Sequence, residues 1–250
     1  KRRNTNNLPD FVMSKIEKIE TYYPNGMLFE KGTKKDGKPV GKWIGCYESG
    51  EKFQETNFED GKPQKTTVWY QNGKKEWERI GYYSGKETQW YENGNRYSEI
   101  NFKGTKKFHG KATLWYENGQ KRDELNYING TCEGKRNSWY ETGEKEYEDY
   151  YKDDNLNGKH ISYFKNGQIF ESGFYKDGKK DGKWTTWYEN GQKKLEGSCK
   201  EDKDDGFQVI WDENGKKIWE GTIKMGDVID DEGFPYSLFD DLNPDKKYSV

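Results

Sequence analysis

The sequence predicts an all-β protein: an elongated, strongly twisted single sheet of about nine antiparallel β-hairpins, arranged as a solenoid. Three observations predict this fold: one short pattern recurs nine times, most copies carry the residues of a hairpin turn, and no copy leaves room for a helix. The pattern is clearest at W-Y-E-N-G-Q-K-K-L-E, which begins at Trp187. A period of 21 to 25 residues is typical of repeat arrays, whose units bury apolar surface mainly against their neighbours. The turn glycines that define this period are Gly26, Gly50, Gly73, Gly94, Gly119, Gly143, Gly167, Gly191 and Gly215.

Each unit is predicted to be a hairpin closed at its Asn-Gly pair. Asparagine precedes the turn glycine in seven units, and Ser49 and Thr142 take its place in the other two. Asn-Gly favours a two-residue type I′ turn, because both residues tolerate positive φ. Such a turn would place the lysine two residues after the glycine directly opposite the tyrosine three residues before it. A Gly/Asp/Lys turn, such as the one at 177–182, then leads into the next unit, so about eighteen short strands are expected.

Aromatic residues supply most of the apolar surface of the predicted sheet. Only 30% of the 250 residues are hydrophobic and 35% are charged, yet the chain holds 10 Trp, 19 Tyr and 12 Phe. This composition argues against a thick aliphatic core and against disorder, since disordered chains are poor in aromatic residues. The Trp-Tyr pair before most turns must place its two rings on opposite faces. The net charge of −2 gives the molecule little field to attract nucleic acid, so no nucleic acid partner is expected.

Charged residues recur at fixed places and form ladders along the predicted sheet. A lysine eight residues before the turn glycine and a glutamate five residues after it become diagonal neighbours, as Lys42 with Glu55 and Lys183 with Glu196. We interpret these pairs as solubilising. A second ladder of cations, two residues after the glycine, has two open interpretations: stems packed on aromatic rings, or a stripe that binds an anionic ligand. The candidate stripe consists of Lys75, Arg96, Lys121 and Lys145 with Tyr91, Tyr116 and Tyr140.

The W-Y-E-N-G and D-G-K signatures resemble those of the MORN (membrane occupation and recognition nexus) repeat superfamily, in its bacterial variant form. The resemblance covers about residues 15–225, nearly the whole chain. It implies a hairpin-repeat sheet that serves as an interaction or scaffold module. Bacterial chains of this kind are grouped as YwqK-type antitoxins, which implies a protein partner, such as a toxin, that is neutralised. The eukaryotic relatives are linked with phospholipid, which implies anionic lipid as the alternative partner.

Catalytic and metal-binding patterns are rejected. Two histidines, His109 beside a glycine and His160 just after one, lie about two repeats apart, and we interpret both as surface turn residues. The three cysteines occupy different repeats, which argues against a disulfide framework or a zinc site. We therefore expect no catalytic residues, no metal and no cofactor, and a protein that is not an enzyme.

Three segments are predicted: a cap or leader remnant at residues 1–14, the nine-unit array at 15–225, and an acidic cap or tail at 226–250. The leading functional hypothesis is a non-enzymatic protein–protein interaction module, of antitoxin, immunity or scaffold type. The alternative is a membrane-proximal scaffold that binds anionic phospholipid. The compartment stays open between the cytoplasm, which we favour, and secretion or the cell envelope. The expected anchors of a protein partner are the rings Trp90, Trp115, Trp139 and Trp187.

Overall fold

The computed structural model describes residues 14–104 and 107–229. The chain forms two compact units, whose boundary in the sequence falls between Asn95 and Arg96. The predicted all-β architecture is confirmed, because the described strands pair antiparallel and the described residues contain no helix. Nearly all of the two predicted caps, at 1–14 and 226–250, lies outside the described residues.

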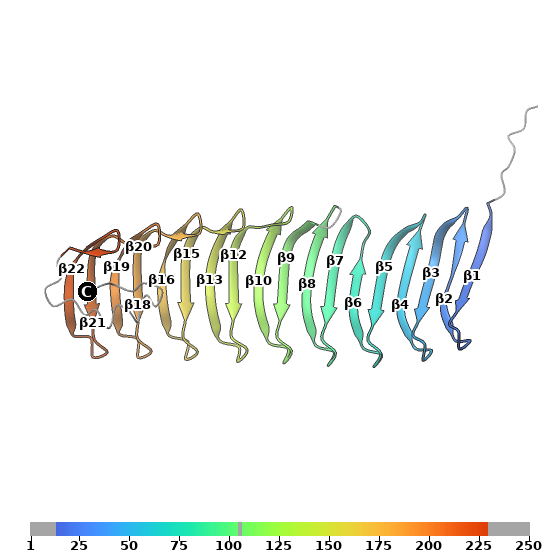
Figure 1. Ribbon diagram of the computed structural model, residues 1–250, viewed down its shortest axis with the longest axis horizontal. Helices are drawn as coiled ribbons and strands as arrows, with labels where there is room; N and C mark the ends of the chain where they lie inside the picture. The colour runs from blue at the N-terminus through green and yellow to red at the C-terminus, as the bar shows by residue number, and fades with distance from the viewer. Residues whose placement is uncertain (1–13, 105–106, 230–250) are drawn as a thin grey trace, which may run out of the picture. The chain divides into compact units, whose positions relative to one another are not determined.

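Within each unit the strands follow one another in sequence order as an antiparallel meander (Figure 1). The first unit contains β1 (Ile16–Tyr22), β2 (Leu28–Lys35), β3 (Lys38–Cys46), β4 (Lys52–Glu59), β5 (Lys62–Trp69), β6 (Lys75–Ile80) and β7 (Ser84–Trp90). The longer strands of the second unit are β8 (Arg96–Lys103), β9 (Lys107–Trp115), β10 (Lys121–Ile128), β12 (Gly134–Trp139), β13 (Lys145–Lys152), β15 (Gly158–Tyr163), β16 (Ile169–Lys176), β18 (Gly182–Trp187), β19 (Lys193–Lys200), β21 (Gly206–Trp211) and β22 (Lys217–Lys224). Two-residue strands follow five of them: β11 (Thr131–Cys132), β14 (Asn155–Leu156), β17 (Lys179–Lys180), β20 (Lys203–Asp204) and β23 (Asp227–Val228).

The Asn-Gly turns differ from the predicted type. Between β18 and β19, the backbone nitrogen of Gly191 donates to the carbonyl of Tyr188 (2.9 Å), and Gly191 has a φ of +84°. Asn190 is not among the described residues with positive φ. The loop is therefore a three-residue type I turn that ends in a left-handed glycine, and the type I′ prediction is wrong here. The longer loop places Lys193 opposite Trp187, not opposite the tyrosine, and a bulge restores the predicted register further along.

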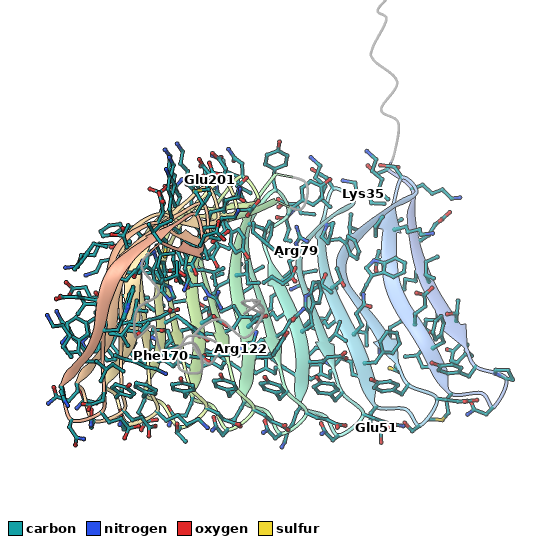
Figure 2. The ribbon with its side chains drawn as sticks, turned by 60° about the vertical axis from the view of Figure 1, so that its left-hand side comes forward. Lys35, Glu51, Arg79, Arg122, Phe170 and Glu201 are labelled. Carbon is teal, nitrogen blue, oxygen red and sulfur yellow. The ribbon has the colours of Figure 1, made fainter. Side chains whose placement is uncertain are left out.

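Type I′ geometry occurs instead at the opposite ends of the strands. Between β2 and β3, Asp36 and Gly37 both have positive φ, 50° and 78°. Glycine adopts this conformation without steric cost, and aspartate tolerates it better than most residues. Figure 2 shows the two kinds of strand end in the first unit, with Glu51 beside a turn glycine and Lys35 at the other end.

In several repeats, the turn asparagine bonds its hairpin to the next one. The Oδ1 of Asn190 accepts from the backbone nitrogen of Gln192 (2.9 Å), and its Nδ2 donates to the carbonyl of Glu213 in the following turn (2.8 Å). The hydroxyl of Tyr188 likewise donates to the carbonyl of Trp211 (2.9 Å). Asparagine therefore stabilises this place through its side-chain hydrogen bonds and not through positive φ. The asparagine contact to the following turn recurs at Asn25, Asn72, Asn118 and Asn166.

Asn190→Ala is expected to lower the free energy of unfolding by about 1–2 kcal/mol, because it removes two side-chain hydrogen bonds. Asn190→Ser, which copies the natural residue at Ser49, is expected to cost less, since its hydroxyl can still accept from the backbone two residues on. Urea unfolding of the two variants and the wild type measures the difference. An alanine variant as stable as the wild type would contradict the structural role of the asparagine.

The sheet of each unit has two unlike faces, because side chains alternate along every strand. We call one the lysine face. It carries the residues eight, six and four places before the turn glycine and those two and five places after it, such as Lys183, Thr185, Trp187, Lys193 and Glu196. The opposite, variable face carries the residues seven and five places before the glycine and those four, six and eight places after it, such as Trp184, Thr186, Leu195, Gly197 and Cys199.

Candidate functional site

The lysine face is a lattice of ion pairs. The Glu55 carboxylate lies 3.0 Å from the ammonium of Lys42 and 2.7 Å from that of Lys52. Lys183 and Glu196 are 2.9 Å apart, so both predicted diagonal pairs are confirmed. Hydrogen bonds from the ammonium groups of Lys52 and Lys42 lower the pKa of Glu55. On this face, glutamates thus neutralise lysines at regular intervals.

The cations of the candidate stripe belong to this lattice. The ammonium of Lys121 lies 2.6 Å from Glu124 and 5.0 Å from the centre of the Trp139 ring in the following hairpin. The Lys121 side chain therefore lies over a tryptophan ring of the following hairpin. It does not lie opposite the tyrosine of its own hairpin, as the predicted register required. The other stripe cations, Lys75, Arg96 and Lys145, pair with Glu78, Glu99 and Glu148. Lys75 also lies over Trp90, and Arg96 over Trp115.

The tyrosines of the candidate stripe bond to neighbouring backbone. The hydroxyl of Tyr116 donates to the carbonyl of Trp139 (3.0 Å), and that of Tyr140 donates to the carbonyl of Tyr163 (2.7 Å). Tyr91 lies in the turn after β7. Burial raises the pKa of Tyr116 and of Tyr140. These phenols therefore have a structural task, and binding of an anion by the stripe stays a prediction.

The four predicted anchors lie half-buried on the lysine face. Trp90, Trp115 and Trp139 each lie under a cation of the preceding hairpin. Trp187 differs, because Ile169 occupies the place that a lysine or arginine holds in most repeats. Their contact with a partner stays a prediction, and the structure gives three of them a packing role as well.

On the variable face, a large side chain on one strand lies against a small residue on the neighbouring strand. Trp184 covers Gly173, where a Cβ atom would lie 2.3 Å from the indole ring. At the corresponding places two repeats earlier are Leu125 and Arg136, and one repeat before those Ile100 pairs with Ala112. Large and small residues thus exchange sides between repeats, and the face has no constant residue at these places.

A buried charge cluster occupies the variable face between β13 and β16. His160 is 5% exposed, and its Nδ1 lies 2.6 Å from Asp149 while its Nε2 lies 3.2 Å from Glu171. Glu171 also binds the ammonium of Lys180 (3.1 Å). The imidazole packs on the Trp184 ring, with 5.6 Å between the ring centres. The interpretation of His160 as a surface turn residue is wrong, because its place in β15 directs it between two carboxylates.

The charge of His160 follows from this setting. Burial lowers the pKa of the imidazole, but the hydrogen bonds and negative charges of Asp149 and Glu171 outweigh it and raise the pKa to about 9. The other histidine, His109, lies half-buried in β9, where its Nδ1 accepts from the backbone nitrogen of Asn129 at a turn (3.3 Å).

A hollow of about 310 Å³ opens on the variable face between β10 and β13. We call it the Cys132 hollow, since this small residue lies in strand order between the larger Tyr127 and Tyr151. Its volume lies at the lower end of the range of small-molecule pockets. The lining residues are Leu114, Asp123, Leu125, Tyr127, Cys132, Arg136, Tyr151 and Asp154.

A salt bridge closes one end of the Cys132 hollow. The guanidinium of Arg136 binds Asp123 through Nε (3.0 Å) and Nη2 (2.7 Å), and its Nη1 donates to the hydroxyl of Tyr151 (3.3 Å). At the other end, Asp154 accepts from the backbone nitrogen of Cys132 (2.6 Å). Burial and then the charge of Asp154 raise the pKa of the Cys132 thiol, so the thiol is protonated near neutral pH.

A second, smaller hollow of about 120 Å³ lies further along the same face. It is lined in part by Phe170, Trp184, Thr186 and the fully buried Gln208. In Figure 2, Phe170 and Arg122 lie nearer the Asn-Gly turn ends of their strands, and Glu201 lies at the other end. None of the residues predicted to bind a partner lines either hollow, and Cys132 and Cys199, which do, were considered only as possible disulfide or zinc residues. In the sequence, the residues around the hollows are recognisable only because they occupy places that vary between repeats.

No group of three or more His, Cys, Asp or Glu side chains in the described part of the chain is arranged to hold a metal ion. Among the same residues, no helix has the length and apolar character needed to cross a membrane.

Comparisons with known proteins address the repeats. Three crystal structures, described as TcdB2-TccC3-Cdc42, TcdB2-TccC3 and TcdB2-TccC3-TEV, align with TM-scores of 0.21, 0.20 and 0.18 at 9%, 10% and 10% identity. Each alignment covers 78% of this chain and 13% of the other. A comparison with curated proteins gives no match. The family model described as a MORN repeat variant matches residues 83–103, 108–129, 156–177 and 180–200, so these four segments are similar to the repeats that the sequence resembles.

Proposed function

We propose that the chain is a non-enzymatic interaction module that binds a protein partner through the variable face of its second unit. One observation carries the proposal: the residues that differ between repeats are gathered on this face, together with two hollows and exposed rings. A specific partner is recognised by side chains that differ along the surface, because a uniform lattice offers every register equally. The similarity of four segments to MORN repeats supports an interaction role in general.

The finer assignment is part of the same proposal. Neutralisation of a toxin, in the manner of a YwqK-type antitoxin, and a scaffold role both rest on the sequence resemblance. The lysine face supports the lipid alternative less well, because the stripe cations are paired with glutamates of the chain itself. Binding to anionic lipid would require the lipid phosphates to compete with these carboxylates.

Phe170 and Phe174 provide a matched test of the binding face, since both belong to β16 and are exposed by 40% and 53%. Phe170 lines the smaller hollow of the variable face, whereas Phe174 is directed to the lysine face. Phe170→Ala is expected to weaken partner binding at least about tenfold, as the loss of a buried aromatic anchor does, and Phe174→Ala to leave it unchanged.

The measurement is affinity capture with the tagged full chain from a lysate of the source organism, followed by calorimetry with the purified partner. The Trp115→Ala/Trp139→Ala variant tests the predicted anchors on the lysine face in the same assay. Loss of binding with this variant and with Phe174→Ala, but not with Phe170→Ala, would assign the interface to the lysine face. Sedimentation with phosphatidylserine vesicles that falls as salt rises, without a captured protein, would favour lipid.

A further inference from the structure

We propose that the Cys132 hollow receives a positively charged side chain of the partner, a lysine ammonium or an arginine guanidinium. The inference rests on the proposed function, because it names the chemistry by which the variable face recognises that partner. Three observations lead to it: the space beside Cys132, a lysine of the chain itself at the corresponding place, and the charges around the hollow.

The space arises from a single small residue. The two-residue strands place one side chain each against the residue eight places after a turn glycine, as Cys132 against Tyr127 and Leu156 against Tyr151. Leucine extends further than cysteine, so the place held by Leu156 offers less room between its tyrosines. With cysteine the space stays open as the hollow of about 310 Å³, with Leu125 and other apolar groups on its wall.

The chain itself holds an ammonium group at the corresponding place two repeats later. Lys180 pairs with Tyr175 as Cys132 pairs with Tyr127. Its Nζ lies 4.0 Å from the centre of the Trp184 ring and 3.1 Å from the Glu171 carboxylate. This place in the repeat therefore accommodates an ammonium. Beside Cys132 the counterparts of Trp184 and Glu171 are Arg136 and Asp123, so a cation there would contact the Tyr127 and Tyr151 rings and Asp154 instead.

The charges favour a cation at only one end of the hollow. At the Arg136 end, Arg136 and Arg122 (3.0 Å) share the single carboxylate of Asp123, so this end does not attract a further cation. At the opposite end, Asp154 lines the hollow, and none of the described ion pairs joins its carboxylate to a lysine, arginine or histidine. The carboxylate of Glu133 lies at the same edge, where it accepts from the backbone beside Asp154. Burial raises the pKa of the Tyr127 hydroxyl, the charge of Asp154 adds to this shift, and the charge of Arg136 opposes it.

The test uses the full chain labelled with ¹⁵N and three capped amino acids as probes. N-acetyl-L-arginine methylamide and N-acetyl-L-lysine methylamide are expected to shift the amide signals of residues around Cys132 and Tyr151 in a saturable way. The neutral isostere N-acetyl-L-citrulline methylamide is expected to leave them in place. The two cationic probes also show whether guanidinium or ammonium binds more tightly.

Two variants locate the site. Cys132→Leu copies Leu156 and is expected to abolish the shifts by filling the hollow. Asp154→Asn keeps an oxygen for the backbone of Cys132 but loses the charge, and is expected to weaken binding roughly fivefold. Asp202→Asn is the matched control, because Asp202 accepts from the backbone of Lys180 (2.7 Å) in the same way but does not line the Cys132 hollow.

Equal shifts with the citrulline probe, or unchanged shifts in both Cys132→Leu and Asp154→Asn, would overturn the inference. Binding of the purified partner then distinguishes a failure of the cation site from a failure of the proposed function. If the purified partner binds Cys132→Leu and Asp154→Asn as tightly as the wild type but loses affinity for Phe170→Ala, the cation site is wrong and the binding face stands. If the cationic probes bind and no protein partner depends on the variable face, the proposed function is wrong and the cation site stands.

Discussion

His160→Leu is expected to lower the free energy of unfolding by about 3–5 kcal/mol near neutral pH. Asp149 is 4% exposed and His160 is 5% exposed, so the substitution leaves a buried carboxylate without its cation. Breaking one partner of a buried ion pair is far more costly than replacing both partners by apolar residues. The Asp149→Leu/His160→Leu double variant is therefore expected to be more stable than His160→Leu alone.

Urea unfolding of the single and double variants measures this effect, with His109→Leu as the matched control. His109 is half-buried and has one backbone hydrogen bond, so its loss is expected to cost much less. A double variant as unstable as the sum of its single variants would show that Asp149 and His160 do not stabilise the fold as a pair.

The pH dependence of stability identifies the same ion pair. The pKa of His160 is about 9 in the folded chain, against an ordinary value of 6.5. Because folding raises the pKa, the stabilisation is fully present below pH 6.5 and is lost as the pH rises through 9. The shift corresponds to about 3 kcal/mol. The wild type is expected to lose stability over this interval, and His160→Leu to show a much flatter profile.

Substitutions at Gly173 and Trp184 are also expected to change the free energy of unfolding strongly, because a large residue at one place requires a small residue at the other. Trp184→Ala is expected to cost about 3–5 kcal/mol, because it empties a place where the indole is 3% exposed. Gly173→Ile alone is expected to cost about 3 kcal/mol, because even a Cβ there would lie 2.3 Å from the indole. The Gly173→Ile/Trp184→Ala double variant places a large residue opposite a small one, as in the pair of Ile100 with Ala112. Its loss of stability is therefore expected to be smaller than the sum of the two single losses.

Thermal and urea unfolding of the two single variants and the double variant measures the coupling. Gly178→Ala serves as a control for substitution of a glycine in the same repeat, since Gly178 has a φ of +83° and its cost comes from backbone strain. Replacing Trp184 should not relieve that strain. Strictly additive effects for Gly173 and Trp184 would contradict size matching on the variable face.

The periodic features of the fold were predictable from the sequence. The spacing of the turn glycines located the hairpins, and the places of Lys42 and Glu55 predicted their contact (3.0 Å). The type of the Asn-Gly turn was not predictable in the same way, because asparagine fits both a type I′ turn and a type I turn that ends in a left-handed glycine. Only the structure shows that Asn190 bonds to the next hairpin.

The variable face was hidden from a consensus of the repeats. His160 and Cys132 are exceptions to the repeated pattern, and an average over nine units removes such residues. Their setting depends on which residue the adjacent strand supplies, as Asp149 does for His160. A comparison that asked where the repeats differ, place by place, would have directed attention to this face. It would not have shown that His160 is buried or that Cys132 borders a hollow.

The size matching described for Gly173 and Trp184 limits how such a chain can evolve. The turns and the lysine face are nearly the same in most repeats, so they would allow one unit to be duplicated, deleted or exchanged with another. The variable face restricts such changes, because most junctions match a different pair of side chains, although Gly32 with Trp43 repeats the match of Gly173 with Trp184. Unequal recombination within the gene would therefore keep the spacing of the hairpins but join mismatched surfaces, and a new junction would require compensating substitutions before the longer or shorter array became stable.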